Sequence, residues 1–167
     1  NGKLVWSQTA YAFLDQDAPD TANPSLWRDT QLNHIYGLFE VTDGIYQVRG
    51  YDMSNVTFIK GDTGWIVIDP LMSVECAQAA FALVEENLGT FPVKAVIYSH
   101  SHVDHFGGVR GIISEEDVQS GDVQVIAPEG FEKYAVSENI YAGTGMGRRA
   151  SYQYGRMLES EETGRHA

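Results

Sequence analysis

The sequence predicts a mixed α/β fold built around one sheet. Three observations carry this prediction: short apolar runs from Phe39 onward, a helix that begins after Ser73, and a further apolar strand at Val93 to Tyr98. Strand, helix and strand follow one another over residues 65–98, which is the order of a βαβ unit. The two strands of such a unit are expected to be parallel.

Length and charge limit the classes of protein to which this chain can belong. Its 167 residues are one domain's worth of chain, and 43% hydrophobic with 20% charged residues is typical of a globular protein. The net charge of −12 is spread along the chain and disfavours binding to nucleic acid or anionic lipid. No apolar run is long enough for a membrane span. The single cysteine, Cys76, excludes an intrachain disulfide and is expected to be a buried helix residue.

Four β-type runs precede the helix. They are Phe39 to Val41, Ile45 to Val48, Val56 to Ile59 and Trp65 to Ile68. Asp43-Gly44 and the stretch from Gly61 to Gly64 are turn signals, and connections this short predict antiparallel neighbours.

The helix has recognisable ends. Ser73 is the expected N-cap and Gly89 the expected C-terminal stop, because hydroxyl side chains and glycine are favoured at these positions. Between them, apolar residues recur at helical spacing at Ala77, Ala80, Phe81, Val84 and Leu88.

The flanks are expected to be less regular. Residues 1–30 contain many aspartate, asparagine and proline breakers, and we expect an arm over residues 1–38, packed on the domain through Trp6, Phe13 and Trp27. Toward the C-terminus, a strand is predicted at 123–127 and helices at 131–139 and 147–159, the second helix starting in a glycine-rich turn.

The segment after the strand that ends at Tyr98 carries the chemistry. His100, His102, Asp104 and His105 place four nitrogen and oxygen ligands within six residues. Three of the chain's five histidines fall here, which disfavours a polar loop with incidental histidines. The pattern predicts a site for two close divalent ions, which would hold a bridging hydroxide and polarise an ester oxygen. Imidazoles with a carboxylate favour zinc, and iron or manganese stay open.

Asp69 is the next candidate. It ends the strand that is expected to lie beside the strand before the histidines, so its carboxylate could hydrogen-bond a ligand histidine or loop amides. The alternative is a turn or capping aspartate before the helix.

The motif His-x-His-x-Asp-His after a strand, preceded by a strand that ends in Asp, resembles the metallo-β-lactamase superfamily. The resemblance implies an αββα sandwich of two mixed sheets with a dinuclear metal site at one edge. It also implies that His100 and His102 bind the first metal while Asp104 and His105 bind the second. Asp104 would in addition orient the reacting water.

A narrower resemblance comes from sequence blocks on both sides of the motif. Blocks similar to the class III alkyl sulfatases include Asn23 to Arg28, Gly44 to Asp52, Gly61 to Leu71, Ala127 to Phe131, and Glu138 to Gly143 followed by Arg148-Arg149. This resemblance implies hydrolysis of small alkyl sulfate esters, such as dodecyl sulfate, with two zinc ions. It further implies a homodimeric bacterial enzyme that is periplasmic or secreted, although the sequence from Asn1 onward shows no signal-peptide pattern.

The chain departs from that family in length. Family members are several times longer and supply two further Glu ligands and one His ligand. We therefore expect residues 39–158 to be the N-terminal half of the sandwich, followed by a divergent tail at 159–167. The chain would then be a fragment of a longer enzyme or a truncated gene product. Two other interpretations stay open: another ester, thioester or lactone hydrolase of the superfamily, and a non-catalytic fragment that binds metal weakly.

Overall fold

The computed structural model describes residues 3–154 and residue 157. The chain divides into two units, one with residues up to Trp6 and Tyr36–Ala135, the other with Ser7–Ile35 and the residues from Val136 onward. The first unit holds the sheet and all of the predicted site residues. The division into an arm at 1–38, a domain at 39–158 and a tail at 159–167 stays a prediction, and the tail lies outside the described residues.

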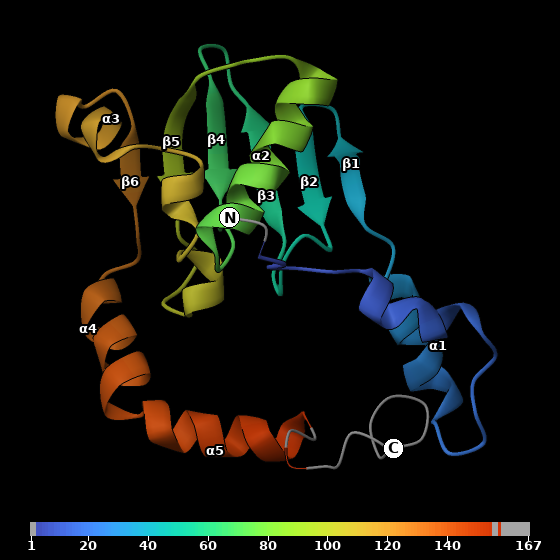
Figure 1. The fold of residues 1–167 in the computed structure, drawn as a ribbon. Coiled ribbons are helices and arrows are strands. Elements are labelled where there is room, and N and C mark those ends of the chain that lie inside the picture. Colours follow the sequence, from blue (N-terminus) through green and yellow to red (C-terminus); the bar gives the residue numbers. More distant parts are fainter. Residues whose placement is uncertain (1–2, 155–156, 158–167) are drawn as a thin grey trace. The chain divides into compact units, whose positions relative to one another are not determined.

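A six-stranded sheet forms the first unit, with its strands side by side in chain order (Figure 1). The strands are β1 (Gly37–Thr42), β2 (Ile45–Arg49), β3 (Val56–Lys60), β4 (Trp65–Ile68), β5 (Val93–Ile97) and β6 (Gln124–Ile126). Strands β1 to β4 are antiparallel neighbours, whereas β4, β5 and β6 are parallel. The predicted mixed α/β fold, its antiparallel hairpins and its parallel βαβ unit are confirmed.

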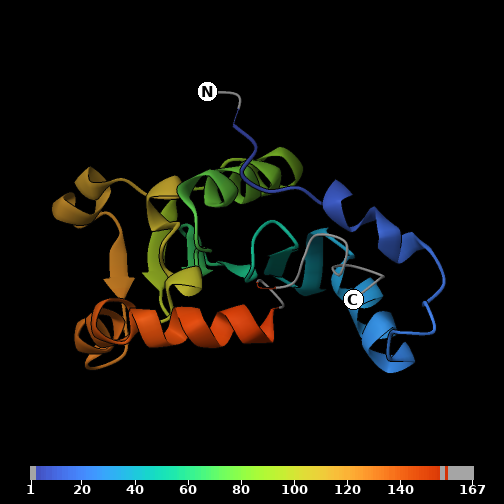
Figure 2. The same ribbon diagram turned by 60° about the horizontal axis from the view of Figure 1, so that its bottom comes forward.

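Helix α2 (Val74–Leu88) covers one face of the sheet, as the nearly edge-on view of Figure 2 shows. Its ends are the predicted ones: the Ser73 hydroxyl accepts a hydrogen bond from the Cys76 amide, and Gly89 follows at a φ of 84°. The core beneath it contains fully buried side chains from helix and strands, among them Val56, Phe58, Trp65, Val67, Ala77, Ala80, Val84 and Val96. Burial of a side chain such as Phe58 contributes about 1.5–3 kcal/mol, so this face is the main source of stability.

Cys76 belongs to this core. It is 5% exposed, and burial raises the pKa of its thiol. The predicted role as a small buried residue on a helix is confirmed.

The opposite face of the sheet is apolar as well. Ile59 pairs with Ile66, and Ile68 pairs with Ile97, so the four isoleucines form two cross-strand pairs. All four are intermediate in exposure, whereas the alternate residues under α2 are buried. Because side chains alternate along a strand, a sheet with two apolar faces calls for a layer on each side.

The connection from β5 to β6 contains three short helices. They are the 3₁₀ helices η2 (Val103–His105) and η3 (Val109–Gly111), and α3 (Glu115–Ser120). A capping box begins α3: the Ser114 hydroxyl accepts from the Asp117 amide while the Asp117 carboxylate accepts from the amide and hydroxyl of Ser114. The pattern Ser-x-x-Asp in the sequence is a signal for such a helix start, although no helix was predicted there.

The capping box predicts a pH effect. The hydrogen bonds from Ser114 lower the pKa of Asp117, so the carboxylate form stabilises the folded state. This contribution is complete above the ordinary aspartate pKa of about 3.9 and is lost as the pH falls through the lower folded-state value. We expect Asp117→Asn to lower the unfolding temperature slightly at pH 6 and to match the parent at strongly acidic pH. The control variant Asp62→Asn, in the exposed β3–β4 turn, should have the unfolding temperature of the parent at both pH values. If Asp117→Asn unfolded at a lower temperature than the parent in strong acid as well, the stabilising role of the Asp117 carboxylate would be contradicted.

The prediction of an irregular stretch over residues 1–30 is wrong. This stretch contains the 3₁₀ helix η1 (Thr9–Asp15) and most of α1 (Pro24–Asn33). The Asn23 carboxamide oxygen accepts from the amides of Ser25 and Leu26, and Pro24 occupies the first turn. Asparagine before proline can begin a helix as well as interrupt one. The first amides of a helix lack backbone partners, so an asparagine side chain can accept hydrogen bonds from them, and proline, which has no amide hydrogen, loses no hydrogen bond there.

The three predicted anchors of this segment have separate contacts. The Trp6 indole donates to the Gly50 carbonyl at 2.8 Å, within the first unit. Phe13 and Trp27 pack against each other, with ring centroids 5.9 Å apart, and the Trp27 indole donates to the Gln16 carbonyl at 3.1 Å.

The helices after β6 follow the predicted positions only in part. Helix α4 (Phe131–Val136) continues into the π-helix η4 (Ser137–Tyr141), and α5 (Gly143–Gln153) follows. The predicted glycine-rich turn is wrong, because the glycines lie inside α5, where each one weakens a helix by about 1 kcal/mol without forbidding it. Among all described residues, no helix is both long and apolar enough to cross a lipid bilayer.

Candidate metal centre

The parallel pairing of β4 and β5 creates the site. Both strands end at the same edge of the sheet, and the Asp69 amide continues the ladder by donating to the Ile97 carbonyl at 3.0 Å. Functional groups of open α/β sheets gather at such carboxyl ends. Asp69 therefore lies beside the start of the histidine segment, as its position in the sequence predicted.

The chain leaves β4 through an unusual turn. Asp69 and Leu71 have positive φ values of 56° and 63°, and the Leu71 amide donates to the Asp69 carbonyl at 2.8 Å. The left-handed conformation costs a non-glycine residue about 1–2 kcal/mol. Complete burial of the Leu71 side chain and the hydrogen bonds of the Asp69 carboxylate offset this cost.

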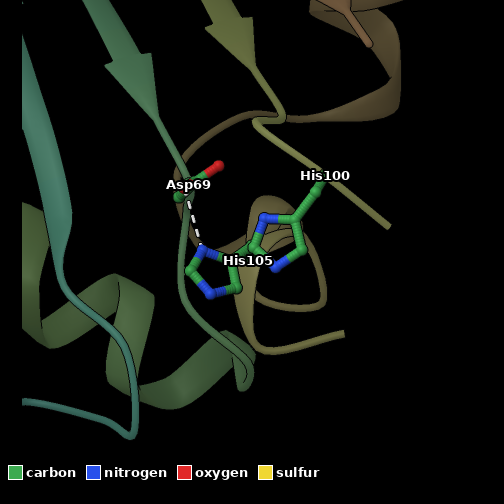
Figure 3. A group of neighbouring side chains, drawn as sticks. All are labelled: Asp69, His100 and His105. Carbon is green, nitrogen blue, oxygen red and sulfur yellow. Dashed lines mark hydrogen bonds and ion pairs between the residues drawn. The ribbon is translucent and has the colours of Figure 1, made fainter. Parts of the chain in front are cut away.

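The Asp69 carboxylate makes three polar contacts. Its Oδ1 accepts from the Ser99 amide at 2.8 Å, and its Oδ2 accepts from the Ser99 hydroxyl at 2.6 Å. Oδ2 also lies 2.9 Å from Nδ1 of His105, the contact drawn as a dashed line in Figure 3. Asp69 thus contacts a predicted ligand histidine and a loop amide, which are the two contacts proposed for it from the sequence.

The histidines lie against one another. The ring centroids of His100 and His105 are 4.1 Å apart, and those of His100 and His102 are 4.6 Å apart. Nε2 of His105 lies 3.2 Å from Oδ2 of Asp104. The structure therefore brings all four residues of the predicted motif together, with His102 the most exposed of them.

These donors fit a metal ion. Two ligand atoms of a tetrahedral zinc ion, each bound at about 2.0–2.1 Å, lie about 3.3 Å apart, which agrees with the Asp104–His105 separation. Asp69, His100 and His105 also offer ligand atoms that all lie within 4.8 Å of one another (Figure 3). Imidazole with carboxylate is a donor set that zinc accepts. Which residues ligate, and whether Asp69 stays outside the metal shell, are still predictions.

Glycines hold the histidine segment against the turn after β4. The Gly108 amide donates to the Leu71 carbonyl at 2.9 Å. A Cβ atom at Gly107 would lie 2.4 Å from the Met72 carbonyl oxygen, and one at Gly108 would lie 2.3 Å from that of Pro70. The absence of side chains at Gly107 and Gly108 therefore allows the two backbone segments to pass close to one another.

Aromatic contacts fix the other side of the segment. Phe106 packs against Tyr98 and Phe131, with centroid distances of 5.8 and 5.1 Å, and Tyr98 stacks on Phe131 at 5.2 Å. Burial raises the pKa of the Tyr98 hydroxyl, as expected for a phenol within an apolar cluster. Packed residues therefore flank the histidines in the chain, with Tyr98 before them and Phe106 and the two glycines after them.

Sequence reasoning gave no role to two buried polar residues of the β2–β3 loop. Asp52, 5% exposed, accepts hydrogen bonds from the amides of Met53, Met72 and Ser73 at 2.7–3.2 Å. Ser54, 8% exposed, donates its hydroxyl to the backbone carbonyl of Asp104. The loop therefore supports both the start of α2 and the candidate ligand Asp104. The only signal in the sequence was the block that ends at Asp52, which belongs to the alkyl sulfatase resemblance.

Comparison with known proteins gives consistent matches. Residues 49–163 match the family model described as the metallo-beta-lactamase superfamily. The chain is 54% identical to a linear primary-alkylsulfatase of Pseudomonas sp. over 98% of its length and 51% identical to an alkyl/aryl-sulfatase of Saccharomyces cerevisiae over 98%. Its structure matches that of an inverting sec-alkylsulfatase from Pseudomonas sp. with a TM-score of 0.88, 55% identity and 99% of this chain covered.

These matches cover a small share of the relatives. The chain spans 24% and 26% of the two sulfatase sequences and 26% of the solved chain. The resemblances drawn from the sequence and the predicted fold are confirmed over this portion. Because the relatives come from bacteria and yeast, the matches by themselves indicate no compartment.

Proposed function

The chain belongs to the metallo-β-lactamase superfamily, and we propose that it forms the N-terminal portion of a metal-dependent hydrolase of small alkyl sulfate esters. One observation carries the proposal: His100, His102, Asp104 and His105 gather at one sheet edge, in a chain more than half identical to an alkylsulfatase. The lengths of the relatives support the proposal that this chain is only a portion of the enzyme, since each relative is about four times longer than the stretch that matches.

The proposed ligand assignment follows the motif. His100 and His102 would hold one zinc ion, and Asp104 and His105 the other. When bound, the zinc ions supply Lewis acidity toward the sulfate ester and lower the pKa of the attacking water. Asp104 would accept a hydrogen bond from that water and orient it, while Asp69 would hold the His105 ring in place.

The apolar second face of the sheet supports the proposed incompleteness of the site. Four ligands for two ions leave each ion two protein ligands, whereas catalytic zinc has three and a water. The isoleucine face of β3, β4 and β5 calls for a second layer. We propose that the remaining ligands and the second sheet come from chain beyond these residues.

Hydrolysis in ¹⁸O-labelled water tests the activity. The complete protein with zinc is expected to release the alcohol and sulfate from dodecyl sulfate, with label in one product. Label in the alcohol would assign attack at carbon, and label in sulfate attack at sulfur. Products without label would contradict a hydrolase. If dodecyl sulfate were untouched while a thioester or lactone turned over, another hydrolase activity of the superfamily would replace the proposed one.

The second candidate function is a non-catalytic chain that binds metal weakly. The short coverage of the relatives favours it for these 167 residues alone. Metal analysis of the purified chain after dialysis decides: weakly held zinc without turnover is expected. Two tightly bound zinc ions with turnover would refute the proposed incompleteness.

The resemblance also supports a homodimer and an exported location for the complete protein, which we include in the proposal. Light scattering of the purified complete protein and fractionation of its host cell measure these two properties directly.

A further inference from the structure

We propose that Ser99 and Asp69 act together as positioning residues that set the tautomers of His100 and His105, leaving Nε2 of each ring unprotonated. The proposal deepens the proposed function, on which it rests for the identity of the ligand. Its structural part concerns only the placement of protons among four described side chains.

The first step concerns the proton of the Ser99 hydroxyl. The Ser99 amide and hydroxyl both contact the Asp69 carboxylate, at 2.8 and 2.6 Å. An ionised carboxylate only accepts hydrogen bonds, so the single hydroxyl proton of Ser99 points to Asp69. The other side of the hydroxyl oxygen then presents lone pairs only.

The second step concerns His100. Its Nδ1 lies 2.9 Å from the Ser99 hydroxyl oxygen. Since that oxygen has given its proton to Asp69, the contact is a hydrogen bond only when Nδ1 of His100 carries a proton. A neutral imidazole has one such proton, so Nε2 of His100 is free to bind a metal ion.

The third step concerns His105, which reaches the same carboxylate directly. Its Nδ1 lies 2.9 Å from Oδ2 of Asp69, so this nitrogen carries the single proton of the neutral ring, and Nε2 then carries none. Nε2 then faces Oδ2 of Asp104 at 3.2 Å. In the neutral ring both atoms are acceptors, and a metal ion bound to both would stabilise their close approach.

One carboxylate therefore serves two histidines, His105 directly and His100 through the Ser99 hydroxyl. The positive φ of Asp69 is part of this arrangement, since it occurs at the residue whose carboxylate must reach the next strand's end. The backbone bond from Asp69 to Ile97 holds the two strand ends in register. The hydroxyl at position 99 is thus expected to matter although the side chain is exposed.

Long-range ¹H–¹⁵N NMR of histidine-labelled, metal-free protein tests the tautomers. Spectra are recorded at about pH 8.5, two units above the ordinary histidine pKa of about 6.5. We expect protonated Nδ1 in both His100 and His105, with signals assigned from His100→Gln and His105→Gln. Ser99→Ala is expected to change the tautomer of His100 alone, and Asp69→Asn those of both rings. Ser99→Thr retains the hydroxyl and should restore the parent spectrum.

Zinc affinity, measured by competition with a chromophoric chelator, is the second readout. Loss of an outer hydrogen-bond partner weakens metal binding about 10–100-fold, and this loss is expected for Ser99→Ala but not for Ser99→Thr. Ser101→Ala, two residues further in the same loop, is the matched control and should bind zinc like the parent.

A proton on Nε2 of His100 in the parent would overturn the proposal, as would an unchanged His100 tautomer and zinc affinity in Ser99→Ala. These outcomes are separate from the proposed function. A protein that fails to hydrolyse alkyl sulfates can still show the two tautomers, and an active sulfatase can still lack them.

Discussion

Alanine at His102 is expected to abolish the proposed alkyl sulfate hydrolysis in the complete protein, by about 10³-fold or more, and to remove one of the two proposed zinc ions. Metal ions supply several kcal/mol of transition-state stabilisation, and about 4 kcal/mol corresponds to a factor of roughly a thousand. His102 is exposed and its ring lies 4.6 Å from that of His100, so its loss should leave the fold intact. Zinc content by mass spectrometry and the rate of sulfate release measure the two effects.

His34→Ala is the matched control for this experiment. His34 is the C-cap residue of α1 and lies outside the motif, so the variant should keep full zinc content and rate. Circular dichroism should show the same helix and strand content in both variants. If His102→Ala retained zinc and rate, the assignment of the motif as the metal site would be wrong.

Alanine at Gly108 is expected to destabilise the chain by about 3 kcal/mol or more, the upper end for overpacking substitutions. The added Cβ would lie 2.3 Å from the Pro70 carbonyl oxygen and 2.7 Å from that of Ser73, and backbone atoms cannot rotate away. Gly108 has a φ of −84°, which alanine adopts readily, so the effect is one of space and not of backbone conformation. The midpoint of urea unfolding measures the change.

Gly147→Ala is the corresponding control. Among the described residues, no atom beyond the adjacent backbone of its own helix lies within 4 Å of a Cβ atom at Gly147, which is inside α5. Replacement of glycine by alanine within a helix stabilises it by about 0.5–1 kcal/mol. An equal change in urea midpoint for the two variants would show that the close contact at Gly108 has no energetic consequence.

Local signals in the sequence predicted most of the sheet and the helix on it. The strands β2, β3 and β4 and the helix α2 begin and end near turn or capping residues such as Ser73 and Gly89, whose preferences act over a few neighbours. Where one residue type has two local meanings, prediction failed. Asn23-Pro24 begins α1 instead of interrupting it, and the glycines after Gly143 lie in a helix instead of a turn.

The candidate metal site divides in the same way. The identities and spacing of His100, His102, Asp104 and His105, with Asp69 at the end of the preceding strand, predicted metal chemistry and indicated the family from the sequence alone. Only the tertiary structure showed that Ser99 lies between Asp69 and His100, that Ser54 contacts the backbone of Asp104, and that Asp52 contacts the start of α2. These contacts join residues up to 50 positions apart in the chain. The register of β4 with β5 brings Asp69 next to Ser99. Ligand types are a property of the sequence, whereas the hydrogen bonds that orient them depend on which strands the fold places side by side.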